Sequence, residues 1–144
     1  MLGIIIAIIS GAAMSIQGVF NTRLSDKIGL WQTNVIVQGT AFLCTLILLF
    51  TLGKNGNWQE IKSVNKLYLL GGLLGVIITY TVMKTVSSIG PTCGISIILV
   101  SQLLTAAIID AFGLFNTNKI KFSLNEFLGL AIMIIGIIIF KCKK

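Results

Sequence analysis

The chain has 144 residues, of which 56% are hydrophobic and 10% are charged, and its formal net charge is +7. A soluble globule of this size needs more polar surface than this composition supplies, so we expect the chain to lie in a lipid bilayer. A bilayer core about 30 Å thick needs about 20 apolar residues per helix, which leaves room for about five spans and no separate soluble domain. The composition predicts an all-α integral membrane protein with a single transmembrane domain over residues 1–144.

Several function classes are disfavoured by the polar residues. The eleven Lys and Arg residues are scattered singly, which indicates contact with lipid headgroups rather than with nucleic acid. The sequence has no histidine, no pair of acidic residues inside an apolar run, and no Ser or Cys beside a plausible base. We therefore expect no enzyme activity, no metal site and no cofactor. Three cysteines without framework spacing also predict that no structural disulfide forms.

Five apolar runs follow one another along the chain, separated by polar residues or by a Gly or Pro break. The expected transmembrane helices are approximately residues 2–22, 31–52, 67–86, 93–114 and 124–140. A polar turn, 23–29, separates the first two, and Gly90-Pro91 separates the third from the fourth. The runs are continuous rather than alternating with a period of two, which argues against a membrane β-barrel.

The positive charges give the chain no clear orientation. Five spans place the N-terminus on one side, here side A, and the C-terminus on the other, side B. Side A carries five basic residues and side B carries six: Lys54, Lys62, Lys66, Lys119 and Lys121 against Arg23, Lys27, Lys84, Lys141, Lys143 and Lys144. Orientation normally follows a clear excess of Lys and Arg on cytoplasmic loops. The balance predicts dual topology, in which two copies pair antiparallel, and the alternative is one orientation set by other features.

Polar side chains recur on one face of each of the first two helices. Gln17 and Asn21 are four residues apart in the first helix, and Asn34 and Gln38 are four apart in the second. Polar groups are costly in lipid, so such faces turn toward other helices or a water-filled cavity. Interhelical hydrogen bonding and solute contact are equal alternatives for these residues.

Further candidates lie in the third and fourth helices. Ser101 and Gln102 fall near the middle of the fourth helix, where a neutral amide can bind a polar solute without a buried charge. Asp110 points toward side A and Lys84 toward side B, so an antiparallel copy would bring one to the depth of the other as an intersubunit ion pair. The alternatives are a snorkelling Lys84 and, for Asp110, a structural carboxylate or a cation or proton site. Small residues suited to close helix packing are Gly71, Gly72 and Gly75.

Three segments also carry a family resemblance. They are residues 11–24 (GAAMSIQGVFNTRL), 71–75 (GGLLG) and 101–115 (SQLLTAAIIDAFGLF). Through them nearly the whole chain resembles the YdcZ-type family of the bacterial drug/metabolite transporter superfamily. The resemblance implies a five-helix half-transporter of the cytoplasmic (inner) membrane that works as an antiparallel homodimer, as a heterodimer with a homologous half, or as a fused pair. Residues at family motif positions are Gln17, Asn21, Gln102 and Asp110, and Ala111 stands where members often have histidine.

The sequence thus predicts a transporter of a small molecule or ion that acts by alternating access as an antiparallel dimer of ten helices. Asp110 and Lys84 are expected as coupling or interface charges. The expected solute-contacting residues are Gln17, Asn21, Gln38, Ser101 and Gln102. The main alternative is a non-transporting half-subunit that needs a different, oppositely oriented partner. The sequence does not identify the solute.

Overall fold

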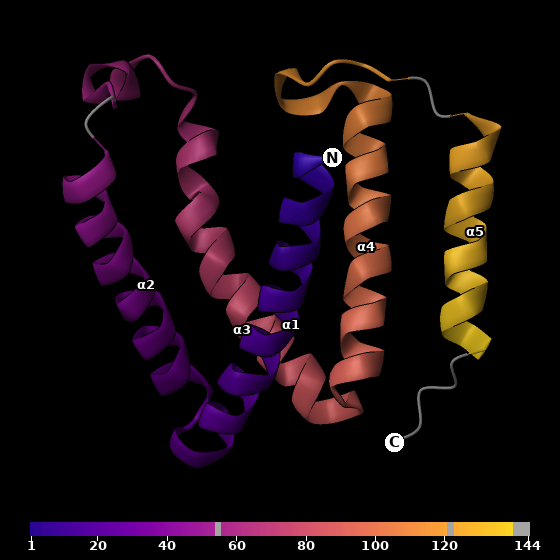
Figure 1. Ribbon diagram of the computed structural model, residues 1–144, viewed down its shortest axis with the longest axis horizontal. Coiled ribbons are helices and arrows are strands. Elements are labelled where there is room, and N and C mark those ends of the chain that lie inside the picture. Colours follow the sequence, from indigo (N-terminus) through magenta and orange to yellow (C-terminus); the bar gives the residue numbers. More distant parts are fainter. Residues whose placement is uncertain (54–55, 121–122, 140–144) are drawn as a thin grey trace. The chain divides into compact units, whose positions relative to one another are not determined.

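The computed structural model describes residues 1–53, 56–120 and 123–139, and these residues form helices and no β-strand (Figure 1). Three short 3-10 helices accompany the longer ones: η1 (Trp58–Lys62), η2 (Lys66–Leu70) and η3 (Leu114–Asn116). The α-helices are α1 (Leu2–Ile28), α2 (Leu30–Leu52), α3 (Gly71–Ile89), α4 (Pro91–Phe112) and α5 (Leu124–Ile139). The expected all-α class is confirmed for the described part of the chain.

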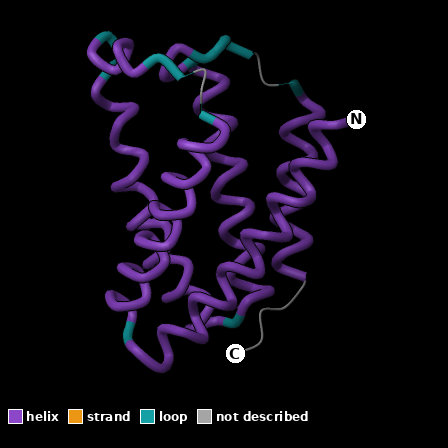
Figure 2. The backbone as a smooth tube through the Cα atoms, turned by 60° about the vertical axis from the view of Figure 1, so that its left-hand side comes forward, coloured by secondary structure: helices purple, strands orange, loops and turns teal. Residues whose placement is uncertain are grey.

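Two of the turns between helices consist of a single glycine. Gly29 has a φ of 96° between α1 and α2, and Gly90 has a φ of 82° between α3 and α4. A positive φ disfavours residues with a Cβ and favours glycine. Pro91 fits the first position of α4, because the N–H that proline lacks would have no partner in the helix there. Glycine therefore sets both turns, and loop backbone is confined to short stretches between helices (Figure 2).

The end of α1 corrects the expectation of a polar turn over residues 23–29. The helix continues to Ile28, and some of its polar side chains find partners on the helix itself. Arg23 Nη1 lies 4.0 Å from Asp26 Oδ2, and the Ser25 hydroxyl donates a hydrogen bond of 2.8 Å to the Thr22 carbonyl. A polar composition does not end a helix, whereas the positive φ of Gly29 does.

Other helix ends shift for similar reasons. α3 begins at Gly71 rather than at residue 67, because residues 66–70 form η2 with the Asn65 side chain accepting from the Leu67 N–H, and it continues to Ile89 rather than to residue 86. α4 covers Pro91–Phe112 rather than 93–114, since Gly113 ends it with a φ of 63°. The expected last residue of the fifth helix, Phe140, lies outside the described residues.

Among the described residues, four helical segments are long and apolar enough to cross a membrane: Leu2–Ile28, Leu30–Leu52, Lys66–Ile89 and Pro91–Phe112. The described part of the fifth helix, Leu124–Ile139, has 16 residues and is also apolar. Large aliphatic side chains are mostly exposed along all five α-helices, as expected where lipid rather than water is the solvent. The architecture is that of a helical membrane protein.

The chain divides into two compact units, Met1–Lys84 and Thr85–Lys144, with the boundary inside α3. In the first unit α1 approaches α3 closely, since a Cβ on Gly18 would lie 3.2 Å from Val82 Cγ1. In the second unit the start of α4 packs on the end of α3, where a Cβ on Gly94 would lie 3.0 Å from Thr85 Cγ2. The single transmembrane domain over residues 1–144 stays a prediction.

The cysteines correct one expectation from the sequence. Cys93, buried in the first turn of α4, is disulfide-bonded, so the prediction that no disulfide forms is wrong. Cys44, in α2, is exposed and free.

Candidate functional site

Two amide side chains of α2 bond directly to α3. The Asn34 Nδ2 donates to the Val76 carbonyl at 2.9 Å, and the Gln38 Nε2 donates to Thr79 Oγ1 at 3.1 Å. Residues 34 and 38 are one turn apart, so both amides lie on one face of α2. These bonds support the packing alternative for Gln38, whose contact with a solute stays a prediction.

An aromatic pair extends this α2–α3 contact toward side B. The Trp31 and Tyr80 rings stack with centroids 4.8 Å apart and an interplanar angle of 21°. Trp31 lies in the first turn of α2, and Tyr80 follows the hydrogen-bonded Thr79. The sequence analysis missed both Thr79 and Tyr80. Their polarity inside the apolar run of α3 was the available signal.

Of the three glycines expected to pack helices, Gly75 lies beside another helix in the first unit. A Cβ on Gly75 would be 3.6 Å from Gln38 Nε2, an ordinary contact. Added Cβ atoms on Gly71 and Gly72 would meet nothing within 4 Å. A packing role for Gly71 and Gly72 therefore stays a prediction and requires a neighbour other than the described residues.

The deeply buried positions of the first unit come from α1, α2 and α3. We name this set the buried junction: Gly18, Thr22, Thr33, Asn34 and Met83. Within it the Thr22 hydroxyl donates to the Gly18 carbonyl at 2.7 Å. By contrast, Thr33 Oγ1 and Asn34 Oδ1 have no hydrogen-bond partner among the described residues. Leaving a buried polar atom unpaired costs about 1–3 kcal/mol.

The two candidate amide residues of α1 take no part in these bonds. Gln17 is exposed and Asn21 is half-buried, and neither side chain makes a hydrogen bond within the described part of the chain. The structure thus leaves both amides available to a second copy, water or a solute. Their role in solute binding stays a prediction.

The polar residues in the middle of α4 are also available. Ser101 and Gln102 are exposed, and neither side chain is hydrogen-bonded to another described residue. Ser101 takes part only through its carbonyl, which accepts from the Thr105 hydroxyl at 2.8 Å. The second unit therefore presents an unpaired hydroxyl and an unpaired amide near the middle of a membrane-spanning helix.

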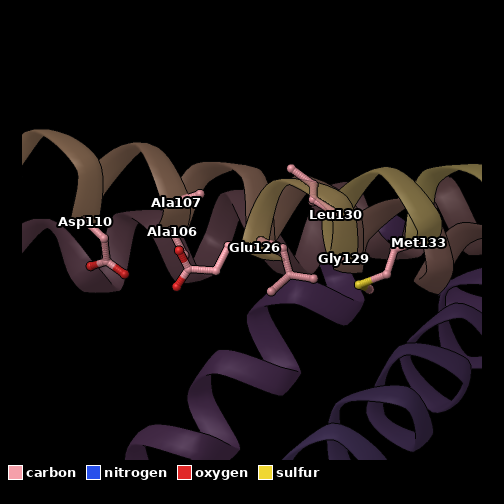
Figure 3. Close-up of a pocket in the computed structure, with 8 residues that line it drawn as sticks. Ala106, Ala107, Asp110, Glu126, Gly129, Leu130 and Met133 are labelled. Atoms are coloured by element: carbon pink, nitrogen blue, oxygen red, sulfur yellow. The ribbon is translucent and has the colours of Figure 1, made fainter. Parts of the chain in front are cut away.

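A groove of about 310 Å³ lies between α4 and α5 in the second unit (Figure 3). Among the described residues, its walls carry two carboxylates and no basic side chain. They consist of Leu103, Ala106, Ala107, Asp110, Glu126, Gly129, Leu130 and Met133. The described walls of the groove are therefore mainly apolar, with an acidic end.

The two acids of the groove differ in their bonding. Glu126 Oε2 accepts from the Ser123 N–H at 2.7 Å, which caps the first turn of α5. The Asp110 carboxylate has no ion-pair or hydrogen-bond partner within the described residues, although its backbone carbonyl accepts from the Ile120 N–H at 3.0 Å. Lys84 is exposed, and it also has no ion-pair partner among the described residues of the first unit. Pairing of Asp110 with Lys84 stays a prediction.

Comparison with known proteins assigns the chain to a family. The sequence model of the family described as "Putative inner membrane exporter, YdcZ" matches residues 2–139. No curated protein and no solved structure matches the chain. The family match extends from α1 to α5 and agrees with the four helices in the described part of the chain that are long and apolar enough to cross a membrane. The chain therefore belongs to the YdcZ family of membrane transporters and is a multi-pass protein of the inner membrane.

Proposed function

We propose that the chain is a half-transporter that pairs with an oppositely oriented second copy, forming ten helices that move a small molecule or ion by alternating access. The observation that carries the proposal is the exposure of Gln17 and Gln102 on membrane-spanning helices, without a hydrogen bond to other described residues. An unpaired amide facing lipid is costly. Both amides therefore indicate contact with a second copy, water or the transported solute. Asn21 and Ser101 extend the same polar surfaces.

The charges support the antiparallel arrangement. Lys84 lies five residues before the end of α3 and Asp110 lies two residues before the end of α4. Consecutive spans run in opposite directions across a membrane, so these charges belong to opposite sides of one chain. A copy of opposite orientation brings Lys84 to within about 5 Å of the depth of Asp110, a difference that a lysine side chain can bridge. The nearly equal numbers of Lys and Arg on sides A and B allow both orientations.

A second candidate function is favoured by the bonds of Asn34 and Gln38 to α3. These bonds show that part of the polar face holds helices together. If all of it did so, the chain would be a non-transporting half-subunit that needs a different, oppositely oriented partner. Exposed Gln17 and Gln102, which hold nothing together in the described chain, favour transport.

Reconstitution of the purified chain by itself distinguishes the two functions. We expect a dimer in detergent and uptake into liposomes of at least one solute from a radiolabelled panel of amines, amino acids, sugars and alkali cations. Liposomes without protein supply the background. Uptake that begins only after a homologous half is added would establish the half-subunit, and absence of uptake under both conditions would contradict transport.

A further inference from the structure

The buried junction contains two polar side chains whose placement is unfavourable in the structure as it stands. Thr33 is 0% exposed and Asn34 is 3% exposed, and the first has an unpaired Oγ1 and the second an unpaired Oδ1 among the described residues. Most other side chains of this unit are exposed. The unpaired atoms therefore lie where neither lipid nor water reaches them, although an apolar residue at either position would avoid the cost.

Within the buried junction, the unpaired polar atoms are confined to Thr33 and Asn34 among the described residues. Thr22 belongs to the same buried junction and is 6% exposed, but its hydroxyl donates to the Gly18 carbonyl at 2.7 Å. Asn34 itself uses its Nδ2 to bond the Val76 carbonyl, which leaves only its Oδ1 unpaired. A hydroxyl that needs a partner and an amide oxygen that needs a donor are both satisfied by water.

Position along the helix determines the side from which water can arrive. Thr33 lies three residues after the start of α2 at Leu30, which places it about 5 Å from the side B end of that helix. The stacked Trp31 and Tyr80 rings and the bond from Asn34 to Val76 join this end of α2 to the middle part of α3. Separation of α2 from α3 would break these contacts and connect the buried junction with the aqueous phase on side B.

We propose that Thr33 and Asn34 form a water-binding gate site, which is closed in this structure and becomes hydrated when α2 separates from α3 on side B. The closed state leaves both atoms unpaired, and hydration of the open state satisfies them, so the two states lie closer in free energy than they would with apolar residues there. The inference rests on the proposed alternating access and adds the location of the gate.

Cysteine accessibility tests the gate without knowledge of the solute. Thr33→Cys, which replaces threonine by a residue of similar volume, and Asn34→Cys are each introduced into a cysteine-free variant, reconstituted into liposomes, and exposed to a charged, water-soluble methanethiosulfonate. The control is Val35→Cys, because Val35 lies at the same depth and is 74% exposed. We expect residue 33 or 34 to react at least about tenfold faster than residue 35, since a thiol in lipid does not ionise. Equal or slower reaction at both residues would overturn the gate.

A further variant separates the gate from the proposed function. Gln17→Cys should react with the same reagent if Gln17 lines the solute pathway. Reaction at residue 17 without reaction at residues 33 and 34 would refute the gate and preserve transport, whereas no reaction at any of them would count against both.

Substitution of the threonine hydroxyl supplies an independent readout. Thr33→Val keeps the side-chain shape, so it should raise the thermal midpoint by about 3 °C and slow the labelling of Asn34→Cys. Thr22→Val is the matched control, since its hydroxyl is already paired, and it should change neither quantity in that direction. Unchanged labelling of Asn34→Cys in the Thr33→Val background would contradict a hydrated open state.

Discussion

The two units of the chain use their polar residues differently. In Met1–Lys84, Asn34 and Gln38 bond α2 to α3, and an aromatic stack continues that contact. In Thr85–Lys144, Gln102 and the Asp110 carboxylate have no hydrogen-bond partner among the described residues. The first unit therefore uses part of its polar set to hold its own helices together. The second leaves the Gln102 amide and the Asp110 carboxylate available to their surroundings, which is what solute binding or assembly requires.

The largest expected effect tests whether the unpaired Gln102 amide of the second unit binds the solute. Gln102→Ala should reduce solute uptake by at least about tenfold, because a lost hydrogen bond to a bound solute is worth 1.4 kcal/mol or more. Its thermal midpoint should not change, since the amide has no partner in the described chain. Leu99→Ala, at another exposed position of α4, is the control and should retain uptake. Unchanged uptake in Gln102→Ala would remove Gln102 from the site.

A smaller effect tests the packing role of polar residues in the first unit. Gln38→Leu should lower the free energy of unfolding by about 1 kcal/mol, because the bond to Thr79 is lost. Gln32→Leu is the matched control, since Gln32 is exposed on the same helix and its amide has no hydrogen bond within the described residues. Thermal unfolding in detergent measures both. Equal stability of the two variants would show that the hydrogen bond between Gln38 and Thr79 does not contribute to the free energy of unfolding.

The smallest effect compares the two acids of the groove. Glu126→Ala should destabilise the protein by about 0.5–1 kcal/mol, because its carboxylate accepts from the Ser123 N–H. Asp110→Asn should stay within about 0.5 kcal/mol of the parent, since the carboxylate has no partner among the described residues. A marked loss of stability in Asp110→Asn would reveal an intersubunit partner, with Lys84 of a second copy the first candidate.

Hydropathy was sufficient to predict where the helices lie but not where they end. Residues 23–28 include four polar side chains and nevertheless extend α1, because glycine geometry at residue 29 rather than polarity ends that helix. Gly113 shortens α4 in the same way. Side-chain partners were harder to predict. Gln38 and Gln102 are the same residue type in apolar runs, and only the approach of α3 to α2 distinguishes the bonded amide from the free one.

The central claim, an antiparallel pair of identical half-transporters, is tested most directly by the orientation of the chain. Gln59 lies exposed in η1 on side A, so Gln59→Cys in a cysteine-free variant can be labelled in intact cells with a membrane-impermeant maleimide. The account predicts that about half of the protein is labelled and that permeabilisation raises labelling to completion. Labelling of all or none of it before permeabilisation would contradict the antiparallel homodimer and require a different partner of opposite orientation.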